Sequence, residues 1–430
     1  MKIAQKRLYE EYTRINEYLC PSSEVKLIKA FLDEYIGEQH SLTLLKMESS
    51  GLVYMIRNNQ LSNLSLLFGM FMRREESFEK LRKCLSEFII EEGNKLVRDE
   101  QIKNEDFVSQ LIQLRDRIVE ISTKAMKKDP QIELTIKLAF EDVVNQNNRT
   151  AKALVLYLDE MFKKDFKTTS ELELNEQLDK IIHVFRYLLD KDVFEGFYKN
   201  SFAKRLLENR HNNEDAERAL VLKLKEECGF QFTQKLEVMF KDIKVSEELT
   251  TEFKTKPSSQ ALSLELNVKV LTQGHWPKDG KEPVPQLVAL PKEIATAMSA
   301  FTQFYFSKFN NGRQIHWKLS LGSAELKGNF HQKYEFLTSS YQMFLLMLFN
   351  DHQQVTYHQV MQITQIPPQD LQQHLIPLIK CKLLNKNPAA HSFTNEDVLS
   401  VNTDYKSSLF RNKIPVMVSK QTKDKEGVKV

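Results

Sequence analysis

The first half of the chain is patterned for amphipathic helices. Apolar residues recur at steps of three and four, and polar residues fill the positions between them. Such helices can bury their apolar stripes only by packing against neighbouring helices. Because connections such as residues 127–130 are short, the pattern predicts a helical repeat or bundle. The clearest stripes are Phe107, Leu111, Leu114, Ile118 and Ile121; Leu178, Ile181, Ile182, Phe185, Leu188 and Leu189; and Leu236, Met239, Phe240 and Ile243.

Proline marks a change of organisation near residue 257. Of the 12 prolines, only Pro21 and Pro130 precede that position. This favours continuous helices before it, because an interior proline costs about 3 kcal/mol. Between Leu262 and Val270, every second residue is leucine or valine and the residues between are polar. The alternation predicts a half-buried strand, after which residues 294–305 return to helical spacing.

A second alternating set predicts a hairpin whose turn is formed by Gly322 and Ser323. The apolar residues on its two arms are Trp317, Leu319 and Leu321, then Ala324, Leu326 and Phe330. We expect both tryptophans, Trp276 and Trp317, to anchor a junction between helix and sheet, because a buried aromatic side chain contributes a large apolar area.

Three short helices and a pair of strands are predicted after residue 340, in the outline of a winged helix. The helices span 341–350, 357–365 and 368–380, and the strands span 382–386 and 398–402. Pro377 lies inside the third helix and removes an amide that would bond to Gln373, so a kink or an early end is expected there. The predicted fold class is therefore mainly α, with a smaller α+β part.

Composition and charge narrow the possible environments. The chain has 61 basic and 58 acidic residues, a net charge of +3, which does not demand nucleic acid as a partner. Its four cysteines are far apart and form no C-x-x-C pair, so a disulfide framework or a zinc site is not expected. Lone thiols suit a reducing compartment, the cytoplasm or the nucleus. No apolar run approaches the roughly 18 residues that span a membrane, and residues 1–6 contain no apolar signal core.

Recognisable catalytic motifs are absent from the sequence. It contains no phosphate-binding G-x-x-x-x-G-K-[ST] loop, no H-E-x-x-H and no G-x-S-x-G. The histidines are scattered, and His183 is expected on the polar side of its helix rather than on a metal. No catalytic residue, metal ligand or cofactor is therefore assigned.

Four ordered blocks of sequence resemble the cullin homology region. They read KDVFEGFYK at 191–199 with AKRLL at 203–207, LKEECGFQFT at 224–233 with KLEVMFKDI at 235–243, GHWP at 274–277, and LGSAEL at 321–326. The stretch MESSGLVYM at 47–55 is most similar to the cullin branch that uses BTB-domain adaptors. The resemblance covers the chain from about residue 10 to about residue 415.

Cullins are elongated, non-catalytic scaffolds of multisubunit RING-type E3 ubiquitin ligases. The resemblance implies an extended stalk of helical cullin repeats, a four-helix bundle and an α/β region with a winged-helix subdomain. It also implies a RING-box protein as partner, through which a ubiquitin-charged E2 enzyme is recruited, so that the scaffold acts by proximity. The expected divisions are 1–50 for the end of the second repeat, 51–165 for the third repeat, 166–310 for the bundle region, 311–405 for the α/β region and 406–430 for a basic polar tail.

The chain also departs from the family pattern. The first stalk repeat, which binds the adaptor, has no counterpart, so stable adaptor binding is not expected. No stretch resembles the site of the lysine that accepts the ubiquitin-like modifier Nedd8, and Lys420 and Lys423 do not match its pattern. Ligation of Nedd8 to this chain is therefore not expected.

Three hypotheses follow. In the first, the RING-box protein adds a strand to the sheet containing Trp317, Leu319, Leu321, Ala324, Leu326 and Phe330, because edge strands offer unpaired backbone groups. Alternatively, these strands only close the core of their own domain. In the second hypothesis, the chain sequesters the RING protein as a truncated regulator. In the third, the helix at 368–380 reads nucleic acid, although it carries Asp370, Gln372, Gln373 and His374 and only Lys380 as a firm cation.

Overall fold

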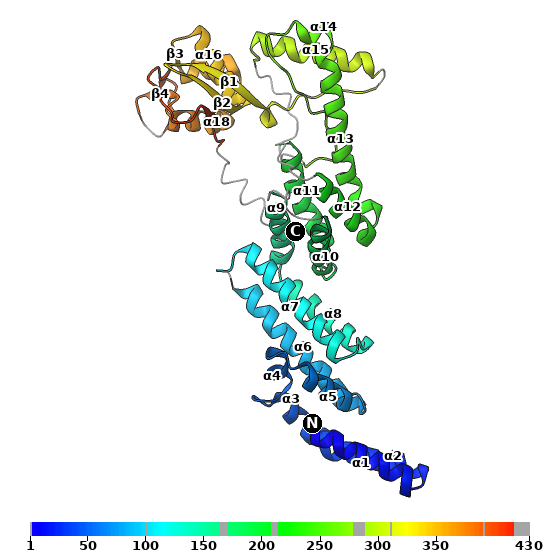
Figure 1. Ribbon diagram of the computed structural model, residues 1–430. Coiled ribbons are helices and arrows are strands. Elements are labelled where there is room, and N and C mark those ends of the chain that lie inside the picture. Colours follow the sequence, from blue (N-terminus) through cyan, green and yellow to red (C-terminus); the bar gives the residue numbers. More distant parts are fainter. Residues whose placement is uncertain are drawn as a thin grey trace. The chain divides into compact units, whose positions relative to one another are not determined.

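The computed structural model describes residues 2–99, 101–163, 171–207, 214–277, 289–309, 312–389 and 392–416. The chain divides into two units, coloured along the sequence in Figure 1. The first, here called the helical unit, comprises Met1–Ile243 and Leu271–Pro277. The second, called the mixed unit, comprises Lys244–Val270 and Lys278–Val430. The predicted fold class, mainly α with a smaller α+β part, is confirmed.

The helical unit is a stack in which helices pack against the next helix but one. Thus α5 packs on α7, α6 on α8, α7 on α9, α9 on α11 and α10 on α12. This arrangement buries each stripe against two neighbours, as in solenoids. The helices are α1 Lys2–Tyr18, η1 Pro21–Ser23, α2 Glu24–Ile36, α3 Glu38–Lys46, α4 Leu52–Arg57, α5 Leu61–Phe71, α6 Glu75–Arg98, α7 Asn104–Ala125, α8 Pro130–Val144, α9 Arg149–Lys163, α10 Glu171–Phe185, α11 Lys191–Leu207, α12 Glu214–Cys228 and α13 Phe230–Lys254, which continues into the mixed unit.

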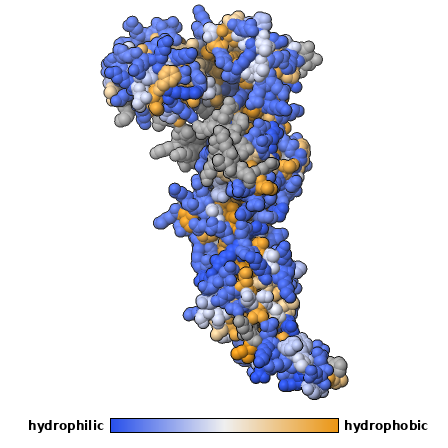
Figure 2. Space-filling model, in the orientation of Figure 1, coloured by the Kyte–Doolittle hydropathy of each residue, from blue (hydrophilic) through white to orange (hydrophobic). Residues whose placement is uncertain are grey.

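One apolar core runs through the helical unit, from Ala4 to Trp276. The predicted stripes of α7 and α13 lie in it or pack against it. The prediction for α10 is wrong at one position: Leu189 is 72% exposed, because α10 ends at Phe185 and the chain turns before it. Hydrophilic residues dominate the face of this unit that Figure 2 shows, as expected when the stripes point inward.

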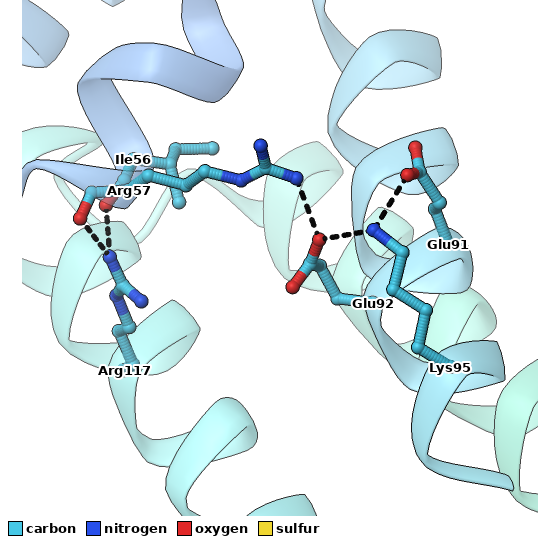
Figure 3. A network of polar contacts seen from close by, with 6 residues as sticks. All are labelled: Ile56, Arg57, Glu91, Glu92, Lys95 and Arg117. Atoms are coloured by element: carbon cyan, nitrogen blue, oxygen red, sulfur yellow. Dashed lines mark hydrogen bonds and ion pairs between the residues drawn. The ribbon is translucent and has the colours of Figure 1, made fainter. Parts of the chain in front are cut away.

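Arginines from one helix layer cap helix ends in another. The α4 helix ends at Arg57, where Arg117 of α7 donates two hydrogen bonds from Nη2, to the carbonyl oxygens of Ile56 at 2.6 Å and Arg57 at 2.7 Å (Figure 3). Arg57 in turn pairs with Glu92 of α6 at 2.8 Å. These bonds satisfy carbonyl groups that a helix leaves unpaired at its C-terminus. They therefore fix the position of α4 against α6 and α7.

A buried ion network joins α9, α11 and α12. Arg205, in the AKRLL block, is 3% exposed and bonds to Glu217 Oε1 through Nε at 2.6 Å and to Asp159 Oδ1 through Nη1 at 2.6 Å. The guanidinium also lies over the ring of Phe162, 5.2 Å from its centroid. Burial lowers the pKa of Arg205, but Glu217 and Asp159 outweigh that effect and raise it further above its ordinary range. The arginine is therefore permanently charged.

Two of the sequence blocks meet at Asp242. Its carboxylate accepts hydrogen bonds from the amide of Thr272 at 2.7 Å and from the indole Nε1 of Trp276 at 2.8 Å. The expectation that Trp276 anchors a helix–sheet junction is wrong. The ring packs in the core of the helical unit, whose described residues form no strand, and its indole bonds to Asp242 of α13.

The mixed unit contains two three-stranded sheets. In one sheet the strand order is β1–β2–β6, with β1 antiparallel and β6 parallel to β2; in the other, β5 lies between β3 and β4 and is antiparallel to both. Its elements are α14 Pro257–Gln260, α15 Lys292–Lys308, η3 Leu319–Leu321, β1 Ser323–Asn329, β2 Lys333–Ser339, α16 Ser340–Asp351, β3 Gln354–Thr356, α17 Tyr357–Thr364, α18 Pro368–Lys380, β4 Leu384–Asn387, β5 Val398–Val401 and β6 Arg411–Lys413.

The winged-helix outline is present, with one correction. The helices α16, α17 and α18 and the pair β4–β5 lie where the sequence predicts them. However, α18 does not end at Pro377 and continues to Lys380. Two polar residues of the suggested recognition helix, Asp370 and His374, are only 8% and 6% exposed. They face the interior of the unit, so the helix does not present them to nucleic acid.

Part of the predicted polar tail belongs to the fold. Residues 411–413 form β6, and Ile414 is 4% exposed within the core of the mixed unit. This strand is short and its residues are charged or polar, so the sequence shows no alternation of apolar and polar positions that would predict it. Lys420 and Lys423 lie outside the described residues. The predicted boundaries at residues 50, 165 and 310 stay predictions.

Acid is expected to loosen the wing formed by β4 and β5. Asp397 accepts hydrogen bonds from the hydroxyl and amide of Thr394 and pairs with buried Lys386 at 2.9 Å, and these contacts lower its pKa to about 2. An unfolded aspartate has a pKa near ~3.9. The stabilisation is therefore complete above about pH 4 and is lost as the pH falls towards about 2.

Hydrogen exchange of β4 and β5 should accelerate across this acidic window. Asp397→Asn should remove that pH dependence and should already loosen the wing at pH 7, because Lys386 loses its counter-charge. Unchanged exchange in the variant at neutral pH would contradict this role.

Candidate partner-binding site

A small aromatic core holds two extended segments of the mixed unit. It is built from the end of α13 and from α15, with Phe253 at 0% and Phe301 at 1% exposure and their rings 5.3 Å apart, edge to face. Four apolar residues of one segment pack against it, Leu262, Leu266, Val268 and Val270, and so do Ile315 and Trp317 of a second segment. Both segments therefore depend on the same platform of aromatic side chains.

The exposure of Leu262–Val270 alternates as predicted, but the chain bends at residues 263–264 and the segment is not part of a sheet. Neither sheet includes it, and it forms no backbone ladder with another described strand. Two hydroxyls on α13 hold it instead. Ser246 accepts from the amide of Val270 at 2.8 Å and donates to its carbonyl, and Thr250 donates to the carbonyl of Val268 at 3.1 Å. The predicted strand is thus corrected to an extended segment anchored to a helix.

These anchors orient the backbone of the segment. In extended chain, the amide and carbonyl of successive residues point to opposite edges. Because the carbonyl of Val268 and both backbone groups of Val270 point to α13, we infer that the backbone groups of Glu265 and Asn267 point to the opposite edge. Both side chains are exposed. This edge, here called the Asn267 edge, has the geometry of an edge strand.

Charges border the segment. Glu265 pairs with Lys254 at 2.5 Å, and the hydrogen bond from Lys254 lowers the pKa of Glu265. Both side chains of this pair are exposed, so the pair is weak and easily exchanged. Lys269 is half-buried, and its desolvation lowers its pKa.

The predicted hairpin is wrong in its first arm and its turn. Residues 313–318 are extended without a described ladder partner, and Leu319–Leu321 is a short 3-10 helix. Trp317 packs edge to face on Phe301 of α15 with centroids 6.0 Å apart, not on a sheet. Gly322 is extended, at φ −74° and ψ 153°, and lies against Ser340, whose amide donates to its carbonyl at 3.0 Å. A Cβ there would lie 2.1 Å from the Ser340 hydroxyl, so the glycine serves close approach rather than a turn.

The second arm is a strand, but its partner is β2. Ala324 and Leu326 lie on β1, opposite Thr338 and Phe336 of β2. Leu326 and Phe330 pack against the mixed unit's own larger core, as does Leu319, whereas Leu321 is 48% exposed. Since β1 is at the edge of its sheet, its outer backbone edge has no strand beside it among the described residues.

The structure thus brings together Trp317 and the segment Leu262–Val270 on one platform, while Leu319, Leu326 and Phe330 belong to the neighbouring core. The sequence reasoning missed the anchoring hydroxyls of Ser246 and Thr250. On a helix, serine and threonine four residues apart resemble any polar surface pair, so no sequence signal identifies them.

Chemically, this arrangement can recognise extended backbone and apolar side chains. Among the described residues, no group of three or more His, Cys, Asp or Glu side chains could hold a metal ion. The four cysteines are free thiols, and burial raises the pKa of Cys84, Cys228 and Cys381. No helix in the described ranges is long and apolar enough to cross a membrane.

Comparison with known families matches two regions of the chain. Residues 1–250 match the cullin alpha solenoid domain, and residues 270–405 match the cullin alpha+beta domain. The first of these matches alone covers more than half of the chain.

Curated relatives resemble the chain over nearly its whole length. Cullin-3 of Dictyostelium discoideum is 35% identical over 463 aligned residues, covering 98% of this chain and 59% of the relative. Cullin-3A of Arabidopsis thaliana is 34% identical, covering 99% and 58%. Cullin-3 of Caenorhabditis elegans is 30% identical, covering 97% and 59%. The chain therefore spans somewhat more than half the length of these relatives.

Proposed function

Because this chain belongs to the cullin family, we propose that it is a non-catalytic scaffold of a multisubunit RING-type ubiquitin ligase and supports ubiquitin-dependent protein degradation. The cullin-3 relatives named above support the branch predicted from residues 47–55. A stack of helices with one continuous core is suited to hold partners at fixed distance, which is how a scaffold contributes to rate.

We further propose that the RING-box protein binds the mixed unit by supplying a β-strand. The observation that carries this proposal is the Asn267 edge: Val268 and Val270 bond to α13, so the backbone groups of Glu265 and Asn267, between exposed side chains, are directed to the other side. A second extended segment, residues 313–317, rests on the same aromatic platform. A strand laid along these segments would satisfy backbone groups and cover the platform, which is the physical basis of strand addition.

The edge proposed here to receive the RING-box strand is not the one predicted from the sequence. The predicted residues Trp317, Leu319, Leu321, Ala324, Leu326 and Phe330 remain candidates, but they contribute unequally. Trp317 flanks the platform. The side chains of Leu326 and Phe330 serve the internal core, so charge introduced there would damage the fold before it tested binding. The E2 enzyme would reach the complex only through the RING-box protein.

A proline substitution tests the strand without touching either core. Asn267→Pro removes one outward amide and places a ring in the path of the incoming strand. We expect the full-length variant to bind a purified RING-box protein at least about tenfold more weakly by calorimetry, since more than one backbone bond is disrupted. The matched variant Asn267→Ala loses the same side chain but keeps the amide, and should bind as the unmodified chain does.

The two variants separate the possible results. Equal binding of Asn267→Pro and the unmodified chain would exclude the Asn267 edge as the docking strand. Failure of the unmodified chain to bind at micromolar concentration would overturn the RING-box proposal itself. Circular dichroism of both variants checks that the helices persist.

A further inference from the structure

A row of alternating charges crosses the sheet that contains β1. In the register of its three strands, Arg411 of β6 lies opposite Glu335 of β2, and Glu335 lies opposite Lys327 of β1. Opposite charges in directly facing positions stabilise neighbouring strands. Among the described residues β1 is the edge strand, and the exposed Lys327 is the last member of the row. A further strand would continue the alternation if it placed a carboxylate opposite Lys327.

The backbone of β1 can accept such a strand. At the two ends of the β1–β2 ladder, the amide of Ser340 donates to the carbonyl of Gly322 at 3.0 Å, and the amide of Phe330 donates to the carbonyl of Gln332 at 3.3 Å. Because direction alternates along an antiparallel ladder, the even-numbered residues of β1 bond to β2 and the odd-numbered residues direct their backbone groups to the outer edge. The odd-numbered residues also have exposed side chains; they are Ser323, Glu325, Lys327 and Asn329.

The sequence of β1 is complementary to itself when reversed about Leu326. If two copies of the strand pair antiparallel with Leu326 opposite Leu326, each glutamate lies opposite a lysine. Apolar and small residues then share the face that packs on the core, and polar residues share the exposed face. The facing residues, each pair formed twice, are Glu325 with Lys327, Ala324 with Gly328 and Ser323 with Asn329.

Charge selects this register over the others. Residues whose backbone groups point outward must face one another, so antiparallel pairing can be centred on a residue of β1 but not between two residues. Centring on Glu325 places glutamate opposite glutamate, and centring on Lys327 places lysine opposite lysine. Centres farther along the strand place neither charge opposite its counter-charge. Only the register centred on Leu326 sets both glutamates opposite lysines.

We propose that two copies of this chain associate through antiparallel pairing of Ser323–Asn329, which joins their three-stranded sheets edge to edge. Glu325 already pairs with Arg411, but the two side chains are 62% and 59% exposed. A carboxylate has two oxygens, so Lys327 of the second copy can bind Glu325 without displacing Arg411. Leu326 keeps its place against the core, so that packing needs no rearrangement.

The association is expected to be weak and dependent on concentration. Seven residues of each copy pair, and they bury less than the roughly 800 Å² per partner that is typical of a stable complex. The β1 edge is distinct from the Asn267 edge. The pairing therefore does not rest on the RING-box proposal, and it includes the chain with a RING-box protein bound.

Paired cysteines test the register without altering the charges or the core. In the full chain carrying Cys20→Ser, which removes the exposed thiol, Ser323→Cys and Asn329→Cys are made separately. When mixed and mildly oxidised, the two variants should form a disulfide-linked heterodimer, because opposed residues lie about 5.5 Å apart between Cα atoms. Neither variant should cross-link to itself, because its two cysteines would be six residues out of step, about 20 Å apart. Equal cross-linking in the mixture and in each variant alone, or none in the mixture, overturns the pairing.

Charge reversal tests the same pairing by rescue between copies. Sedimentation equilibrium of the unmodified chain should show a monomer–dimer equilibrium. Glu325→Lys or Lys327→Glu alone should weaken dimerisation about tenfold, because each places two pairs of like charges opposite one another. An equimolar mixture of the two variants should dimerise as the unmodified chain does, which a folding defect in either variant would prevent. Absence of any dimer in the unmodified chain, or no recovery in the mixture, refutes the proposal.

A purified RING-box protein distinguishes the possible occupants of this edge. Because its strand is proposed to bind the Asn267 edge, a saturating amount should leave the cross-link between Ser323→Cys and Asn329→Cys intact. Loss of the cross-link on binding would assign the β1 edge to the RING-box strand and refute the pairing of RING-box-bound chains. If the RING-box protein does not bind and the cross-link persists, the RING-box proposal fails and the pairing of copies stands.

Discussion

Replacement of Arg205 by alanine is expected to lower the free energy of unfolding of the helical unit by about 3–5 kcal/mol. The guanidinium is 3% exposed and bridges Glu217, itself 1% exposed, with Asp159. Removing it takes from the buried Glu217 carboxylate the two hydrogen bonds of the guanidinium, and a buried carboxylate that loses a charged partner is strongly unfavourable. The same substitution also deletes the contacts with Phe162 and Tyr198.

The measurement uses the position of the two tryptophans. Trp276 packs in the core of the helical unit and Trp317 in the mixed unit, so urea unfolding followed by fluorescence in a Trp317→Phe background reports the helical unit alone. The double variant Arg205→Met with Glu217→Leu should recover much of the loss, because both charges of the most deeply buried pair are removed together and Asp159 keeps its pair with Lys163. A loss below about 1 kcal/mol in Arg205→Ala would show that water reaches the network.

The helices could be predicted from sequence because apolar residues spaced three or four apart form the face of a helix that is buried. In α7, the stripe from Phe107 to Ile121 was predicted on one face, and that face is the buried one. The short helices α16, α17 and α18 were equally clear, since their ends carry recognisable signals. Thr356, for example, caps α17 in a capping box with Gln359.

Strands were harder to predict because alternation reveals one-sided burial but not the source of the hydrogen bonds. The segment Leu262–Val270 and β1 both alternate, yet within the described ranges β1 has a strand beside it and the segment does not. At Gly322, a glycine between alternating runs suggested a turn, whereas its actual role is close approach to Ser340. Both errors concern partners distant in sequence, which no local pattern identifies.

The candidate site was only partly visible for the same reason. The LGSAEL block includes the start of β1, and a role of this region in partner binding stays a prediction. Trp317 flanks the aromatic platform. The anchors Ser246 and Thr250 lie about 20 residues from the backbone groups they hold. Their importance emerges only when the extended segment is placed along α13.

Replacement of Phe253 by alanine is expected to disable the candidate site rather than merely loosen it. Phe253 is 0% exposed and contacts Phe301 and Phe304 of α15, with ring centroids 5.3 and 5.4 Å away. Truncating a buried phenylalanine costs about 3–5 kcal/mol, from lost burial and the cavity that remains. This core has few members, so little packing is left to absorb the loss. The platform under Leu262–Val270 should open.

Hydrogen exchange and binding should then change together. We expect exchange of the Val270 amide, which donates to Ser246, to accelerate by about 100-fold or more, as a local opening energy falls by about 3 kcal/mol. RING-box binding should fall with it, because the incoming strand loses its platform. Phe253→Leu keeps most of the volume and should cost less than about 1.5 kcal/mol. Phe140→Ala is the matched control: it deletes an equally buried ring in α8 of the helical unit and should leave exchange in 262–270 unchanged.

If Phe253→Ala accelerates exchange while RING-box binding is unaffected, the extended segment is not part of the docking surface. If neither changes, the aromatic core does not support the segment, and the physical basis proposed for the site fails.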